Sequence, residues 1–191
     1  QYIDFRNQNP IPGVMPILAG LGSPQEMKVH DEKWHTENFM WGNSRVRRKG
    51  FWNEEVAKEW TDTMEKSRTR LISCHNCPMK CGATISMPGL PTYMMKCFTK
   101  LTYTMAAMSD LDFGLKIAKR ATEYGVDGFS TPQVMAFALE LYENGILTDD
   151  DMPDMPSDSE GRFYYLLDKI VRREGIGDVL ANGTHWAAKE I

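Results

Sequence analysis

The chain has 191 residues, of which 42% are hydrophobic and 25% are charged, enough for one sizeable core but not for several large domains. Its formal net charge is -4, from 22 basic and 26 acidic residues, which excludes a protein that binds nucleic acid or an anionic membrane through overall charge. No run of about 18 apolar residues occurs, so no transmembrane segment is predicted.

Residues 1–52 show little periodicity and many Gly and Pro residues, so we predict an irregular, loop-rich segment. Aromatic side chains such as Trp34 and Trp41 are interleaved with charges there, which is typical of loops that wall an active site. Residues 53–191 are predicted to form a second, helical domain.

The pattern from Asn53 onward is mainly helical. Val56, Trp60 and Met64 recur at helical spacing, which predicts a helix from Asn53 to about Leu71. Caps and periodicity predict further helices over residues 98–108, 111–124, 131–145 and 157–175, the last opened by a capping box at 157–160, with short helical segments around Val179 and from Thr184. Proline and glycine predict a loop between Cys81 and Phe98, and no β-hairpin is predicted. The predicted fold class is therefore mainly α.

Both ends of the chain indicate a fragment. The sequence starts at Gln1 and stops at Ile191 within a helical pattern. We therefore expect a site built by this chain to need residues from outside it.

Three of the four cysteines form the motif C-x2-C-x3-C at Cys74, Cys77 and Cys81, and Cys97 is the fourth. Such clustering is unlike the spread cysteines of a disulfide-stapled secreted domain, so we expect reduced thiols and a cytoplasmic protein. Soft thiolates favour zinc or an iron–sulfur cluster, both of which take four ligands. The residues alone leave both open, the zinc alternative being a non-enzymatic helical module with Cys97 as the fourth ligand.

Four blocks in register are more specific than this motif alone. They are residues 74–81, 123–131, 137–145 and 173–183. In this order and spacing they resemble the tungsten-containing aldehyde:ferredoxin oxidoreductase family over roughly residues 50–191. The resemblance implies the helical, cofactor-binding portion of an oxidoreductase that carries a 4Fe-4S cluster and a tungsten bis-pterin (tungstopterin).

The resemblance assigns the cysteines. It implies that Cys74, Cys77 and Cys81 are ligands of the 4Fe-4S cluster, and that the fourth ligand lies beyond this chain. Cys97 is the remaining thiol, and because a thiolate is a natural soft ligand for tungsten, Cys97 is our candidate protein ligand to that metal. Its alternatives are a fourth cluster ligand and a buried structural cysteine.

The resemblance also implies a pterin contact. The D-x-x-G-L-D motif of the family, which contacts one of the two pterins, corresponds here to Gly125, Val126 and Asp127, whereas Thr122 replaces its first acid. Gly125 has an alternative role as an ordinary helix C-cap, so Asp127 is the stronger candidate for cofactor binding.

Within the family, residues 96–100 and the aromatic, histidine-bearing N-terminal stretch most resemble the tungsten subunit of class II benzoyl-CoA reductases from strictly anaerobic bacteria. That resemblance implies reduction of benzoyl-CoA, or a similar aromatic acyl-CoA, to a cyclic dienoyl-CoA, in a larger complex with an iron–sulfur electron-transfer subunit. The alternative is oxidation of aldehydes to carboxylic acids. It is less favoured because the loop after Cys81 lacks the acids that aldehyde-oxidising members tend to carry.

Ring reduction needs proton donors in a dry pocket, where desolvation raises the pKa of a carboxyl group toward the working pH. The candidates are Glu26, Glu32 and His35; the latter two are three residues apart and suit one face of a helical turn. The basic residues 45–49 suit the phosphates of coenzyme A, or alternatively a solvated loop or subunit contact.

Overall fold

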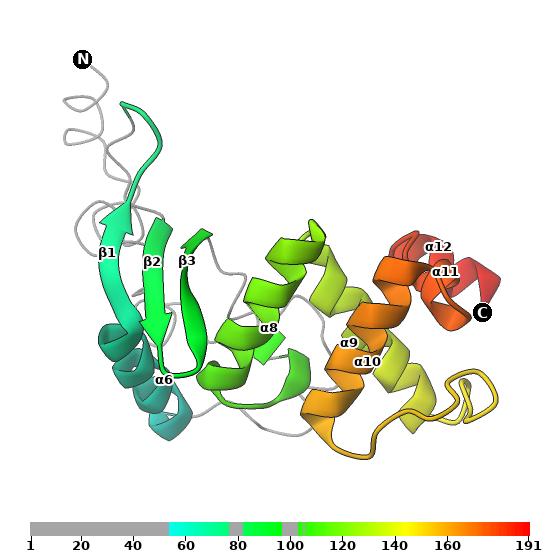
Figure 1. Cartoon of the computed structure of the whole chain (residues 1–191). Helices are drawn as coiled ribbons and strands as arrows, with labels where there is room; N and C mark the ends of the chain where they lie inside the picture. The colour runs from blue at the N-terminus through cyan, green and yellow to red at the C-terminus, as the bar shows by residue number, and fades with distance from the viewer. Residues whose placement is uncertain (1–53, 77–81, 97–102, 105) are drawn as a thin grey trace, which may run out of the picture. The chain divides into compact units, whose positions relative to one another are not determined.

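The computed structural model describes residues 54–76, 82–96, 103–104 and 106–191 (Figure 1). These residues belong to two compact units that divide between Phe98 and Thr99. We call the described part of residues 54–96 the sheet unit and that of residues 103–191 the helical unit. The predicted boundary between residues 52 and 53 stays a prediction, because residues 1–53 lie outside the described residues.

The sheet unit combines one helix with a small antiparallel sheet. Its elements are α6 (Glu54–Ser67), β1 (Arg68–Ile72), β2 (Gly82–Met87) and β3 (Leu90–Lys96), and the strand order is β1-β2-β3. Helix α6 contacts β1 and β2. Trp60 and Met64 of α6 are buried, as are Ala83, Ile85 and Met95 of the sheet, so the apolar stripe predicted from the helical spacing does face a core.

Two predictions for this unit were wrong. The helix predicted to continue to about Leu71 ends at Ser67, and the predicted loop after Cys81 is a β-hairpin. Met87 pairs with Leu90, so Pro88 and Gly89 form a two-residue turn, in which Gly89 takes a φ of 76° that side chains disfavour. Pro91 is tolerated because β3 is an edge strand. Proline and glycine therefore mark a turn between strands rather than an extended loop.

The helical unit confirms the mainly α fold class. Its longer elements are α8 (Leu111–Tyr124), α9 (Ser130–Glu143) and α10 (Ser159–Arg172), followed by the short helices α11 (Ile176–Leu180) and α12 (Thr184–Glu190). Of residues 98–108, Tyr103, Thr104, Ala106 and Ala107 are described and helical. The cap of α10 differs slightly from the predicted box, because Asp158 rather than Ser157 accepts the cap hydrogen bond, from the N–H of Gly161 at 2.7 Å.

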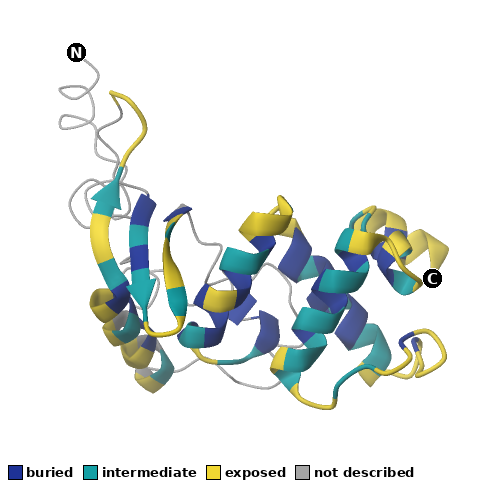
Figure 2. Cartoon of the chain, viewed as in Figure 1, coloured by how far each residue is buried: buried dark blue, intermediate teal, exposed yellow. Residues whose placement is uncertain are grey.

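One continuous apolar cluster holds this unit together. Figure 2 shows the buried faces of α8, α9 and α10 turned inward, and the cluster includes Phe113, Ile117, Leu139, Phe163 and Leu166. The ring of Phe113 meets those of Phe163 and Tyr164 edge-on, at centroid distances of 6.3 and 5.7 Å. Helix α11 packs on α10, and at Gly177 a Cβ atom would lie 2.2 Å from the carbonyl oxygen of Lys169. Only glycine allows that approach.

None of the helices in the described part of the chain is long and apolar enough to cross a membrane.

Candidate functional site

The cysteine motif lies in the connection between β1 and β2. The two strands pair antiparallel, and Ile72, the last residue of β1, is the partner of Gly82, the first residue of β2. Cys74 follows Ile72 by two residues and is exposed. Cys77 and Cys81 lie outside the described residues. The pairing therefore closes the base of the connection that carries all three thiols.

The residue before the fourth cysteine lies at the same end of the sheet. Gly82 also pairs with Lys96, the last residue of β3, so Ile72, Gly82 and Lys96 form one row across the sheet (Figure 1). Cys97 follows Lys96 in the sequence and lies outside the described residues. The chain leaves β1, enters β2 and leaves β3 at this row, so the segments that carry the four cysteines start from one end of the sheet.

This arrangement fits a thiolate-bound metal group. The donor set is soft sulfur, an exposed thiol is present at Cys74, and sheet pairing fixes both ends of the motif. In the described residues, no group of three or more Cys, His, Asp or Glu gathers as a metal site, and three of the four cysteines lie outside them. The sequence analysis did not predict this row of paired residues. The available signal was the Pro88-Gly89 turn, which was interpreted as part of a loop.

The second candidate region is the turn between α8 and α9. Gly125 ends α8 with a φ of 73°, and its N–H donates to the carbonyl oxygen of Thr122 at 3.1 Å. The N–H of Val126 donates to the carbonyl oxygen of Ala121, also at 3.1 Å, which completes a Schellman cap. Val126 packs against the core cluster. The C-cap role weighed for Gly125 is thus confirmed, and the turn is fixed on both sides of that residue.

Asp127 is the polar centre of this turn. Its Oδ2 atom accepts hydrogen bonds from the N–H of Phe129 at 3.0 Å and from the N–H and hydroxyl of Ser130, the latter at 2.5 Å. Burial raises the pKa of Asp127, but these hydrogen bonds outweigh it and hold the pKa below its ordinary value. The exposed side chain is therefore an ordered carboxylate at neutral pH.

The geometry of Asp127 fits a pterin. All three hydrogen bonds use Oδ2, and Oδ1 accepts none from any residue that the structure describes. A pterin ring presents N–H donors, and an ionised carboxylate is a strong acceptor for them. One oxygen can therefore accept the N–H groups of Phe129 and Ser130 at the start of α9 while the other receives a ligand.

A buried phenol lies behind the same turn. The Tyr103 side chain is fully buried, and its hydroxyl meets no partner with hydrogen-bond geometry within the described part of the chain. Burial raises the pKa of Tyr103, the neighbouring hydroxyl of Thr131 lowers it, and the negative charge of Asp127 raises it. Among the described residues the Thr131 hydroxyl lies near the Tyr103 hydroxyl without meeting hydrogen-bond geometry. A buried hydroxyl left unsatisfied costs stability.

The predicted proton donors Glu26, Glu32 and His35 lie outside the described residues, as do residues 45–49. Of the predicted site residues, the structure therefore places Cys74, Gly125, Val126 and Asp127. The last three lie together in one turn of the helical unit, whereas Cys74 belongs to the sheet unit.

Comparisons with known proteins agree on one family. A family model described as "Aldehyde ferredoxin oxidoreductase, domains 2 & 3" matches residues 5–191. The tungsten-containing aldehyde ferredoxin oxidoreductase of Thermococcus kodakarensis is 32% identical over 127 residues, which cover 61% of this chain and 20% of the relative. The WOR-like subunit of an aliphatic sulfonate oxidoreductase from Pyrococcus furiosus is 46% identical over 70 residues, 36% of this chain and 11% of the relative.

A solved structure is more similar. It is described as the active site complex BamBC of benzoyl coenzyme A reductase in complex with 1,5-dienoyl-CoA, and it matches with a TM-score of 0.80 and 77% sequence identity. The match covers 99% of this chain and 29% of that chain. This chain thus spans about a fifth of the tungsten-containing relative from T. kodakarensis and less than a third of the solved chain.

Proposed function

The chain belongs to the aldehyde ferredoxin oxidoreductase family, and from this premise we propose that it is part of the catalytic subunit of a tungsten and iron–sulfur oxidoreductase. Its proposed reaction is the reductive dearomatisation of benzoyl-CoA, or a similar aromatic acyl-CoA, to a cyclic dienoyl-CoA. The observation that carries this proposal is the 77% identity, over 99% of the chain, to a complex solved with 1,5-dienoyl-CoA.

In this proposal Cys74, Cys77 and Cys81 hold a 4Fe-4S cluster whose fourth ligand lies outside this chain. The closed base of their connection, at the pairing of Ile72 with Gly82, supports it. Cys97 is the proposed protein ligand of tungsten. When bound, the cluster and the tungsten bis-pterin would relay electrons of low potential to the ring.

Gly125, Val126 and Asp127 are the proposed pterin contacts. Gly125 and Val126 shape the turn, and the Oδ1 atom of Asp127 would accept a hydrogen bond from a pterin N–H. The hydrogen bonds on Oδ2 support this assignment, because they hold the carboxylate in place before a ligand arrives.

Reduction of the ring to the diene takes two electrons and two protons. We assign proton donation to Glu26, Glu32 and His35 in the first 52 residues, and we propose that Trp34 and Trp41 exclude water from these groups. The electrons come from an iron–sulfur partner subunit, and we place the complex in the cytoplasm.

A second candidate is the oxidation of aldehydes to carboxylic acids, which the 32% identity to a tungsten-containing aldehyde ferredoxin oxidoreductase favours. The two reactions separate in one experiment. The intact protein, purified without oxygen, is analysed for iron, sulfide, tungsten and zinc, and is then assayed with a low-potential dye against benzoyl-CoA, 1,5-dienoyl-CoA and simple aldehydes.

We expect iron, sulfide and tungsten, with turnover of the CoA thioesters and none of the aldehydes. Turnover of aldehydes alone would replace the proposed reaction by the second candidate. One zinc per chain without iron or tungsten would support the non-enzymatic module with a four-cysteine zinc site and would overturn both proposed reactions.

A further inference from the structure

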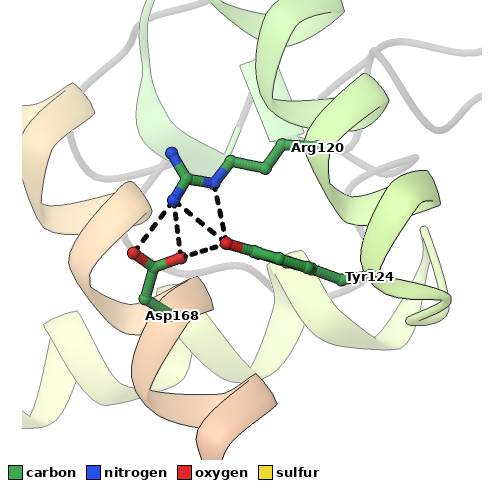
Figure 3. A network of polar contacts seen from close by, with 3 residues as sticks. All are labelled: Arg120, Tyr124 and Asp168. Atoms are coloured by element: carbon green, nitrogen blue, oxygen red, sulfur yellow. Dashed lines mark hydrogen bonds and ion pairs between the residues drawn. The ribbon is translucent and has the colours of Figure 1, made fainter.

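A polar network lies at the C-terminal end of α8, directly before the Asp127 turn. Figure 3 shows its three members, Arg120 and Tyr124 of α8 and Asp168 of α10. The Tyr124 hydroxyl donates to Oδ1 of Asp168 at 2.9 Å and accepts from Arg120 Nε at 3.1 Å and Nη2 at 3.0 Å. Nη2 of Arg120 also reaches both Asp168 oxygens, at 3.0 and 3.1 Å.

The network joins two helices through the last residue of one of them. Tyr124 ends α8 and Gly125 is its C-cap, so the next three residues are the proposed pterin contacts. The Arg120 guanidinium carbon also lies 5.5 Å from the ring centres of both Tyr124 and Tyr164. The end of α8 is thus tied to α10 at a point three residues from Asp127.

The network is too exposed to exist mainly for stability. The side chains of Arg120 and Asp168 are 42% and 32% exposed, and Tyr124 is 37% exposed, so solvent screens its charges. The apolar cluster already holds α8 and α10 together. The network adds a fixed position for the C-terminal end of α8 relative to α10, because its three side chains are hydrogen-bonded to one another.

We propose that Tyr124, held by Arg120 and Asp168, is a positioning residue for Asp127. This inference rests on the proposed function, in which Asp127 contacts a pterin. The network fixes the C-terminal end of α8. The Schellman cap at Gly125 and Val126 then fixes the turn relative to that end, and this places the Asp127 carboxylate where it can contact the ligand.

The chain offers a matched control. At the end of α9, the Tyr142 hydroxyl bonds Asp149 at 2.6 Å, and the Arg162 guanidinium lies 5.6 Å from the Tyr142 ring centre. The same three residue types thus form an exposed contact that is not followed by a candidate pterin turn. Tyr124→Phe and Tyr142→Phe each remove one hydroxyl and leave the ring in place.

The first readout needs no cofactor. In the intact protein, hydrogen exchange of the Val126, Phe129 and Ser130 amides reports on the turn, because these N–H groups bond Ala121 and Asp127. We expect Tyr124→Phe to speed their exchange about three- to fivefold and Tyr142→Phe to leave it unchanged. Unchanged exchange in Tyr124→Phe would overturn the inference.

The second readout is tungsten relative to iron in the same preparations. We expect Tyr124→Phe to lower tungsten about three- to fivefold while iron is kept, and Tyr142→Phe to lower neither. Asp168→Ala should reproduce the loss, and the double variant should lose no more than either single variant, because the groups act as one unit.

Faster exchange with full tungsten content would overturn the positioning role. A wild-type protein without tungsten would overturn the proposed function instead, and the exchange result would still decide whether the network fixes the turn.

Discussion

The two units support their proposed cofactor-binding residues with different amounts of packed structure. In the sheet unit one helix packs on three short strands, and β1 keeps Thr69 and Arg70 exposed. In the helical unit one apolar cluster includes residues from Tyr103 to Ala187, and Val126 of the Asp127 turn packs against it. The segments that carry the cysteines start from these short strands, so metal binding should contribute to the stability of this unit. The Asp127 turn, by contrast, is formed by protein contacts alone.

The largest expected effect separates the cysteines. Cys77→Ser should abolish the cluster and lower the stability of the sheet unit, because serine oxygen is a harder and weaker ligand than thiolate. Cys97→Ser should keep iron and the paramagnetic signal of the reduced cluster while tungsten binding and ring reduction fail. Iron and tungsten per chain, with that signal, are the measurements.

Loss of iron in Cys97→Ser would make Cys97 the fourth cluster ligand. Full iron content in Cys77→Ser would remove this cysteine from the cluster, and with it the contrast between the two units.

The next prediction tests whether the stability of the helical unit depends on the close packing of α11 against α10. Gly177→Ala places a Cβ atom 2.2 Å from a backbone carbonyl oxygen of α10, which should cost about 2–3 kcal/mol of unfolding free energy. Gly183 has a φ of 88° and open space around it, so Gly183→Ala should cost only about 1 kcal/mol. Thermal or urea unfolding compares them, and equal costs would contradict the close approach.

A smaller effect concerns the charge in the turn. Asp127→Ala should cost about 1 kcal/mol at pH 7, because it removes the acceptor of the Phe129 and Ser130 N–H groups at the start of α9. The pKa of Asp127 is lower in the folded state than its ordinary value of 3.8, so this contribution is full above that pH and is lost as pH falls through the folded value.

Asp127→Asn retains an acceptor oxygen for these N–H groups and should cost less, with no titration in this range. Unfolding curves at several pH values provide the test. A difference between wild type and Asp127→Ala that persists unchanged at the lowest pH would refute the role of the ionised carboxylate.

The smallest effect has the opposite sign. Tyr103→Phe removes a buried hydroxyl that lacks a partner in the described residues and should raise the stability of the cofactor-free protein by up to about 1 kcal/mol. Tyr165→Phe removes a hydroxyl bonded to the carbonyl oxygen of Pro153 at 3.0 Å and should lower it slightly. Destabilisation by both variants would show that the Tyr103 hydroxyl is satisfied.

Helices α8 and α10 could be predicted because each carries its own boundary signal. Gly125 ends α8 where expected, and the capping residues before α10 mark its start within one residue. Four sequence blocks also sufficed for the family, which residues 5–191 confirm. Such signals are local, so a single sequence contains them.

The sheet could not be predicted in the same way, because strand pairing is non-local. Nothing near Lys96 in the sequence indicates that Gly82 lies beside it, and Pro91 argues against a strand until its edge position is known. The Asp168 partner of Tyr124 is equally distant, 44 positions along the chain. The candidate turn was therefore predicted from its motif, whereas its support on α10 was not.

The hairpin tip at Pro88 and Gly89 is exposed and lies at the opposite end of β2 from the row of Ile72, Gly82 and Lys96. Backbone pairing sets the spacing at the row, so the tip has no part in it. Sequence inserted at the tip lengthens a surface turn at small entropic cost and leaves the register below unchanged. The tip is therefore the place where an affinity tag or a reporter peptide can be built into the sheet unit without moving the strands from which the four cysteines depart.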